Sequence, residues 1–138
     1  MTPEQVALVQ GSFAELGPRI RDLAARFYEL LFEDDPSLRS MFSSDAVVQE
    51  SLFTSELAVI VRSIPHFEAF VARTRRLGTR HARYGVTYAH YEIAERALLS
   101  ALEDTLGTAF TDEVRDAWRL GFDLVAETMM QGAAEVAP

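Results

Sequence analysis

The sequence predicts an all-α protein with six to eight helices, and three observations support this prediction. Apolar residues repeat at spacings of three and four along most of the chain, as they do in amphipathic helices. Glycine and proline are scarce, with 7 and 5 residues, and many of them fall between the apolar stretches. No window shows the short apolar alternation between turns that is typical of a strand. The length of 138 residues corresponds to a single domain over residues 1–138.

The first two predicted helices are delimited by residues that start and stop helices. Threonine, proline and glutamine at positions 2, 3 and 5 have the order of a capped helix start. The glycine and proline at 17–18 interrupt this helix. A second helix has an apolar face over residues 20–31 and stops before Pro36, because the residue that precedes a proline is pushed out of helical geometry.

The remaining predicted helices differ in length and have short connections. They are a short turn at 36–42 and longer helices at about 46–63, 67–83, 88–106 and 111–131. Up-and-down bundles favour helices of matched length. Uneven helices that pack at steep angles are typical of a fold that encloses a ligand.

Composition and charge exclude several classes of protein. The 13 basic and 21 acidic residues give a net charge of −8, which argues against a binder of nucleic acid or of anionic membranes. All basic residues are arginine, so lysine Schiff bases and lysine-dependent phosphate loops are excluded. The absence of cysteine excludes disulfides and thiolate metal sites. No apolar run is long enough to span a membrane, and no leader is seen, so we expect a cytoplasmic protein.

One of the three histidines has surroundings that suit a ligand site. His81 lies near the end of the helix predicted at 67–83, with Leu77 one turn earlier on the same face. The turn that contains Tyr84 and Val86 follows directly, so the backbone turns away from the helix within a few residues of His81. A flat ligand could therefore approach the His81 ring from one side. A single histidine in a helix is otherwise more often structural than a ligand.

A second group of candidates is aromatic and polar. Tyr28 stands on a mainly apolar helix, Phe42 ends the short turn, and Gln49 and Phe53 are four residues apart on one face. Core packing explains the phenylalanines equally well. A buried Tyr28 hydroxyl needs a hydrogen-bond partner, and an inward-facing Gln49 needs one too. With His81, they form a candidate site for a small ligand.

The segments that carry these residues resemble the globins. RFYELLFEDDPSLRSMF at 26–42 and LGTRHARYGV at 77–86 resemble bacterial single-domain haemoglobins and the haem domain of flavohaemoglobins most closely. Segments 90–107 and 110–118 continue the resemblance, which covers essentially the whole chain. It implies a globin fold whose helices enclose a haem pocket, and haem b as cofactor.

The resemblance also implies roles on the side of the iron ligand. His81 matches the histidine that binds the haem iron, and Tyr91 matches the tyrosine that reaches this histidine in flavohaemoglobins. The residues expected to contact the cofactor are Phe42, Leu77, His81, Tyr84, Val86 and Tyr91.

On the gas-binding side, Tyr28 and Gln49 match the distal tyrosine and glutamine, and Phe53 lies one turn deeper. Another register would put Val48 and Leu52 in the distal positions. We prefer Gln49 because its spacing from the two flanking motifs fits without a gap.

Two departures from flavohaemoglobins affect the expected chemistry. We expect no flavin- or nicotinamide-binding domain after the segment that resembles them. The glutamate that completes their proximal triad has no secure counterpart after Trp118, since neither Glu127 nor Glu135 falls at its position. The resemblance therefore does not imply a strongly electron-donating histidine or peroxidase-like activity.

The leading functional hypothesis is reversible binding of O2, as in oxygen transport, with NO and CO as further ligands. The alternatives are dioxygenation of nitric oxide to nitrate with a separate reductase, and gas sensing through a partner. Five arginines around His81 could pair with haem propionates, form a solvated face, or dock an acidic reductase; they are Arg73, Arg75, Arg76, Arg80 and Arg83. Monomer and homodimer both remain open.

Overall fold

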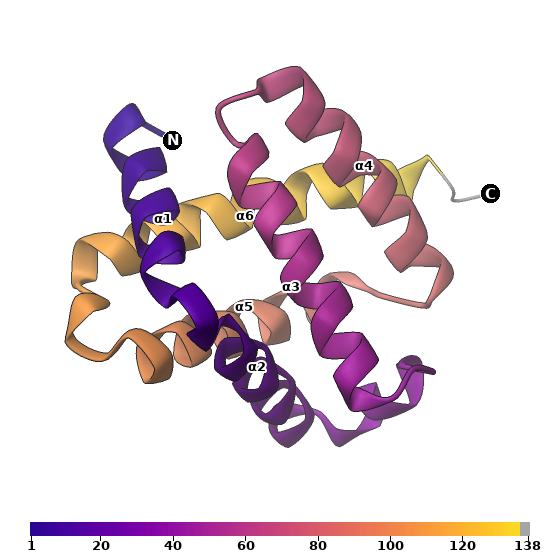
Figure 1. Cartoon of the computed structure of the whole chain (residues 1–138). Coiled ribbons are helices and arrows are strands. Elements are labelled where there is room, and N and C mark those ends of the chain that lie inside the picture. Colours follow the sequence, from indigo (N-terminus) through magenta and orange to yellow (C-terminus); the bar gives the residue numbers. More distant parts are fainter. Residues whose placement is uncertain (136–138) are drawn as a thin grey trace.

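The computed structural model describes residues 1–135 and is built only of helices and their connections (Figure 1). The six α-helices are α1 (Pro3–Leu16), α2 (Ile20–Asp34), α3 (Ala46–Ser63), α4 (Phe67–Arg83), α5 (Tyr88–Leu106) and α6 (Asp112–Ala134). Three short 3-10 turns connect them, η1 (Gly17–Arg19), η2 (Pro36–Met41) and η3 (Gly107–Ala109). The all-α prediction is confirmed, and every long predicted helix is present.

The predicted start of α1 is confirmed in detail. The Thr2 hydroxyl accepts a hydrogen bond from the Gln5 backbone N–H (3.1 Å), and the Gln5 side chain accepts one from the Thr2 N–H (2.8 Å). α1 ends at Gly17, whose φ of 51° lies in the left-handed region that glycine tolerates best. α6 differs from the prediction, because it continues three residues beyond position 131. Gly132 stays inside this helix, where its lack of a side chain allows close packing against α4.

The main core lies between α1, α2, α5 and the first half of α6. Leu16, Leu23 and Leu102 are fully buried there. One buried polar chain accompanies them, since the Trp118 indole donates to the Ser12 hydroxyl (2.8 Å), which donates to the Leu8 carbonyl (2.6 Å). Both donors of this polar chain thus have an acceptor, which avoids the cost of an unpaired polar group.

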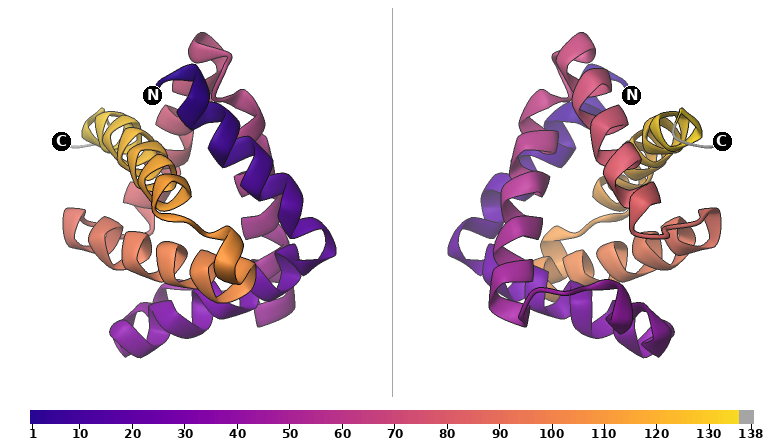
Figure 2. Two further views of the ribbon diagram at one scale, coloured as in Figure 1. Left: turned by 90° about the vertical axis from the view of Figure 1, so that its left-hand side faces the viewer. Right: turned by 90° about the vertical axis from the view of Figure 1, so that its right-hand side faces the viewer.

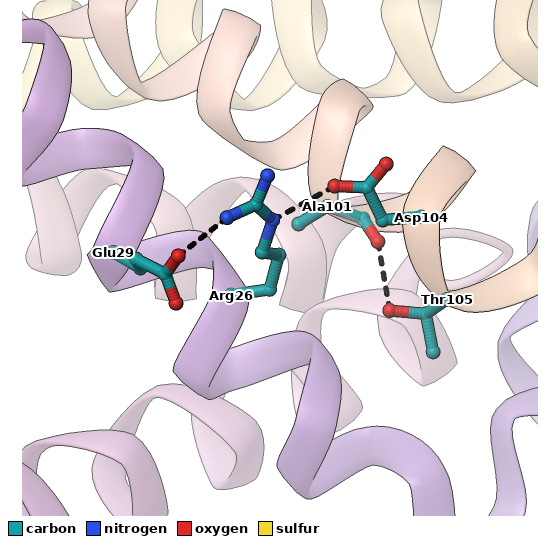
Figure 3. Close-up of polar contacts among 5 residues, drawn as sticks. All are labelled: Arg26, Glu29, Ala101, Asp104 and Thr105. Atoms are coloured by element: carbon teal, nitrogen blue, oxygen red, sulfur yellow. Dashed lines mark hydrogen bonds and ion pairs between the residues drawn. The ribbon is translucent and has the colours of Figure 1, made fainter.

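Ion pairs join α2 to α5 at the surface of the molecule (Figure 3). The Arg26 guanidinium donates to Asp104 of α5 (2.8 Å) and to Glu29 of its own helix (2.6 Å). Beside it, the Thr105 hydroxyl donates to the Ala101 carbonyl (2.8 Å). Exposed pairs of this kind contribute about 0–1 kcal/mol, so the buried leucines stabilise the crossing more than the charges do.

A glycine contact holds α4 against α6. A Cβ atom on Gly78 would overlap the Met129 backbone, and one on Gly132 would overlap the Arg75 backbone. The Thr79 hydroxyl also donates to the Gly132 carbonyl (3.0 Å). The two helices can approach this closely only because both positions lack a side chain. This contact sets the position of the helix that carries His81.

α3 and α4 meet at the corner near Pro65 and diverge away from it (Figure 1). The steep, uneven helix packing expected from the sequence is visible in both views of Figure 2. None of the helices in residues 1–135 has the length and apolar character needed to cross a membrane.

Candidate functional site

His81 lies in the last turn of α4, where it is held by its own helix. Its Nδ1 atom is 2.9 Å from the Leu77 carbonyl oxygen. A carbonyl can only accept, so Nδ1 carries the proton and Nε2 keeps a free lone pair. Burial lowers the pKa of His81, an effect that the Leu77 hydrogen bond opposes and the Arg80 charge reinforces. A neutral imidazole with an available Nε2 is a ligand for a metal ion.

A charge on α3 also acts on His81. The Glu56 carboxylate raises the pKa of His81 slightly, against the effect of burial. The same carboxylate pairs with Arg73 of α4 at 2.8 Å. The second oxygen of Glu56 and the Nε atom of Arg73 are buried without a protein partner among the described residues. His81 lies one turn after Leu77, which packs in one buried cluster with Ile60 of α3, so this side of α4 faces α3.

Nothing in the sequence indicated the Glu56–Arg73 pair. The two residues are 17 positions apart and belong to different helices. No local spacing links them, because only the corner between α3 and α4 brings them together.

Tyr28 and Gln49 form a partly buried hydrogen bond between α2 and α3. The Gln49 amide donates to the Tyr28 hydroxyl oxygen at 3.0 Å, and Tyr28 is only 9% exposed. Burial raises the pKa of Tyr28, although the Gln49 contact lowers it in part, so the phenol keeps its proton. Because the Tyr28 oxygen accepts in this bond, its O–H is left to donate to another group.

Aromatic rings hold Tyr28 in place. Phe53 stacks on Phe27 with ring centres 4.5 Å apart, and both Phe42 and Phe53 present edge contacts to Tyr28 at 5.5 and 5.7 Å. Such contacts add to the burial of apolar area and restrict the orientation of the tyrosine. The structure thus brings together the four residues Tyr28, Phe42, Gln49 and Phe53, as the sequence suggested.

A cavity of about 100 Å³ adjoins the Tyr28–Gln49 pair. Phe32 and Arg39 line it together with Phe42, and the Arg39 guanidinium lies over the Phe32 ring at 4.7 Å. Neither Phe32 nor Arg39 was a candidate, because an aromatic residue on a helix and an arginine in a short turn have many ordinary uses. Its lining comes from α2, η2 and the start of α3 with the residues before it, and it does not include His81 of α4.

The residues of the two registers considered for α3 differ in their exposure. Gln49 is half-buried and reaches Tyr28, whereas Val48 is 46% exposed and Leu52 is 57% exposed. Asp45 caps the helix by accepting from the Val48 N–H (3.0 Å). The helix start therefore orients position 49, and not position 48, toward α2.

Three of the other expected cofactor contacts, Leu77, Tyr84 and Val86, lie within five residues of His81 in the chain. Leu77 is buried, Val86 is half-buried and donates its N–H to the His81 carbonyl (3.1 Å), and the exposed Tyr84 ring lies edge-on to His81 at 6.5 Å. Tyr91 is half-buried, and burial raises its pKa. No hydrogen bond within residues 1–135 involves the Tyr91 hydroxyl, so the protein alone does not join Tyr91 to His81.

Tyr91 also lines a groove of about 510 Å³ between α5 and α6. Two carboxyl groups face each other there, Glu95 from α5 and Asp123 from α6. Burial and the nearby Asp123 carboxylate raise the pKa of Glu95 to about 7, while Arg119 acts in the opposite direction. This group titrates near neutral pH, and nothing in the sequence indicated it.

Two relatives show similarity over most of this chain. An anaerobic nitrite reductase of Gossypium hirsutum is 27% identical, over 88% of this chain and 84% of that protein. A flavohaemoprotein of Bordetella pertussis is 26% identical, over 94% of this chain but only 33% of its own length.

Solved structures share the fold. An engineered carbene transferase from Rhodothermus marinus, assigned as a nitric oxide dioxygenase, is 30% identical with a TM-score of 0.88, over 99% of this chain and 95% of the other. A bacterial globin from Campylobacter jejuni is 21% identical with a TM-score of 0.85, over 98% of each chain.

The family model that matches this sequence is Globin, over residues 25–129. That range begins in α2 before Tyr28, includes all of α3, α4 and α5, and extends into α6. The matched range carries Tyr28, Gln49 and His81 in one helical fold, and this chain belongs to the globin family.

Proposed function

We propose that this globin holds haem b through His81 and binds O2 and other diatomic gases reversibly beside Tyr28 and Gln49. The observation that carries the proposal is the 2.9 Å contact between His81 Nδ1 and the Leu77 carbonyl. This contact selects the tautomer whose Nε2 can bind iron, and it fixes the ring before any ligand arrives. Globins are haem proteins, and imidazole is a suitable ligand for haem iron.

The side chains around His81 and Phe42 suit a flat, largely apolar cofactor. Phe42, Phe53 and Val86 are apolar but only half-buried by the protein itself. A porphyrin between α3 and α4 would cover such surface, at about 25 cal/mol per Å² of apolar area removed from water. Leu77, Tyr84 and the ring of Tyr91 are proposed as further contacts.

When haem is bound, its iron supplies the position at which O2 coordinates. The free O–H of Tyr28 donates to the gas ligand, and the Gln49 amide either holds the tyrosine oxygen or donates to the ligand itself. Each hydrogen bond contributes about 1 kcal/mol, which slows O2 release roughly fivefold to tenfold. CO is a weaker hydrogen-bond acceptor because it carries less negative charge, so we expect selectivity for O2 over CO.

Dioxygenation of nitric oxide to nitrate is the second candidate function. It is favoured by the 30% identity to the engineered Rhodothermus marinus protein, which is named for that activity. Turnover requires a separate reductase that returns ferric iron to the ferrous state. The cytoplasmic location and the oligomeric state stay predictions.

The absorption spectrum of the purified protein tests the first proposal. We expect a Soret band, a pyridine haemochrome of the b type, and a mainly five-coordinate ferrous form, since glutamine is a weaker iron ligand than histidine. A protein that takes up no haem would contradict the cofactor. A ferrous spectrum with two histidine ligands would contradict the distal role of Gln49.

A further inference from the structure

A row of arginines runs along one side of α4. Residues three and four apart on a helix lie on the same face. The members of this row, at successive spacings of three, four and three, are Arg73, Arg76, Arg80 and Arg83. We call this row the arginine stripe. Arg73 pairs with Glu56, whereas the other three are exposed and form no ion pair with a residue between 1 and 135.

The packing of α4 leaves the stripe open to solvent. The opposite edge of the helix, at Gly78 and Thr79, is in contact with α6. Arg75 lies toward that edge and pairs with Glu135 at 3.9 Å, so it is not part of the stripe. In the right-hand view of Figure 2, α4 lies on the near side of the molecule.

The stripe contrasts with the charge of the rest of the protein. α4 contains five arginines and one glutamate, a net charge of +4, so the remainder of the chain carries −12. A nucleic acid or an anionic bilayer would meet repulsion from this large acidic remainder. A partner with a localised acidic patch fits better, because it can contact the stripe and avoid the other faces.

We propose that the arginine stripe docks an acidic electron-transfer protein, which delivers electrons to iron held by His81. The proposal rests on the proposed function, since His81 lies in the chain between Arg80 and Arg83. Docking here brings the donor to the helix that carries the iron ligand. A reduced flavin or iron–sulfur centre of the partner loses one electron and ferric iron gains it to become ferrous, and no bond is made or broken.

Two matched double variants test the stripe. Arg76→Gln with Arg83→Gln removes two exposed charges from it, while Arg21→Gln with Arg62→Gln removes two exposed charges from α2 and α3. Both variants change the net charge equally. The probe is a flavodoxin of negative net charge, and its affinity for the globin is measured by a label on the flavodoxin. The rate at which the reduced flavodoxin converts the ferric globin to the ferrous form is measured separately.

At low ionic strength, we expect the stripe variant to lose about tenfold or more in both affinity and reduction rate, because a charged docking surface raises association rates by such factors. The difference should vanish at about 1 M salt, where the screening length is about 3 Å. The control variant should remain within about twofold of the wild type.

Several outcomes would overturn the proposal. Equal affinity of both double variants for flavodoxin would show that the stripe is not the docking surface. A loss of binding without a slower reduction would exclude the electron-donor role. A lower ratio of Soret absorbance to protein, with flavodoxin binding unchanged, would assign the arginines to the haem propionates instead. A dimer that dissociates only in the stripe variant, again with flavodoxin binding unchanged, would indicate a second copy of the chain as the occupant.

The failure of the proposed function would look different. A wild-type protein without a Soret band would refute haem binding, but the flavodoxin affinity does not depend on haem absorbance. The two double variants would then still decide whether the stripe binds an acidic protein.

Discussion

The α2–α3 side of the candidate site is a packed aromatic cluster around one partly buried hydrogen bond, whereas the α4 side presents a histidine on a charged helix. Tyr28 is enclosed by Phe42 and Phe53 and bonded to Gln49. His81 has one bond to its own helix, and the charges that act on its pKa belong to Arg80 and Glu56.

The two sides also differ in what supports them. The aromatic cluster is continuous with the main core, but α4 depends on its contact with α6 and on a smaller group of buried residues, which are Ile60, Phe70, Leu77 and Met129. Changes on the α2–α3 side should therefore alter ligand chemistry with little change in fold. Changes on the α4 side should alter cofactor retention and stability.

The largest effect is expected from His81→Ala. The substitution removes the proposed iron ligand, so stable haem binding should be lost, as judged by the ratio of Soret absorbance to protein. His66→Ala is the control, because His66 is an exposed residue before the first turn of α4 and makes no side-chain cap there. Full haem occupancy and an unchanged spectrum in His81→Ala would refute the proposal that His81 is the iron ligand.

Gly78→Ala should destabilise the whole protein. A Cβ atom at Gly78 overlaps the Met129 backbone, so α4 must move away from α6, at a cost of roughly 1–3 kcal/mol. Thermal unfolding should show a Tm several degrees lower, with weaker haem retention.

Gly11→Ala is the matched control for this change. Nothing lies within 4 Å of a Cβ at Gly11, and alanine in a helix is favoured by about 0.5–1 kcal/mol over glycine. It should raise Tm slightly. An equal change in Tm for Gly78→Ala and Gly11→Ala would mean that the contact between α4 and α6 leaves room for a Cβ atom at position 78.

Tyr28→Phe tests the other side. The ring and its aromatic contacts remain, but the donor is lost, so O2 should dissociate about fivefold to tenfold faster and Tm should change little. CO dissociation should change far less. Stopped-flow and photolysis experiments measure both rates, and Tyr88→Phe, an exposed tyrosine, serves as control. Similar changes for both gases would indicate that Tyr28 only packs.

The smallest effect concerns pH and Glu95. Its pKa in the folded protein is about 7, above the usual 4.5, so the folded state binds this proton more tightly than the unfolded chain. The stabilisation is present at low pH and is lost as pH rises toward 7. Glu95→Gln should therefore raise Tm relative to wild type more at pH 8 than at pH 5.

Glu127→Gln is the control for Glu95→Gln. It removes one exposed carboxylate from α6 and so changes the net charge equally. Thermal unfolding at both pH values measures the two variants together. An identical pH dependence for Glu95→Gln and wild type would show that Glu95 and Asp123 do not share a site.

Local sequence determined the helices and their ends. Thr2 and Asp45 cap helices through contacts three residues away, and Gly17 and Pro36 lie at breaks. These effects depend on neighbouring residues only, so they could be predicted. The motifs around Tyr28 and His81 also indicated the family for the same reason, since each lies within a short contiguous segment.

Tertiary structure alone decided which distant groups meet. The bond from Gln49 to Tyr28 joins residues 21 positions apart, and the Glu56–Arg73 pair and the Gly78 and Gly132 contacts depend on how whole helices cross. Helical periodicity says which residues share a face, but the crossing of two helices depends on the side chains of both. That is why the sequence could group Tyr28, Gln49 and His81 as candidates for one site, while the Glu56–Arg73 pair and the raised pKa of Glu95 emerged only when the helices packed together.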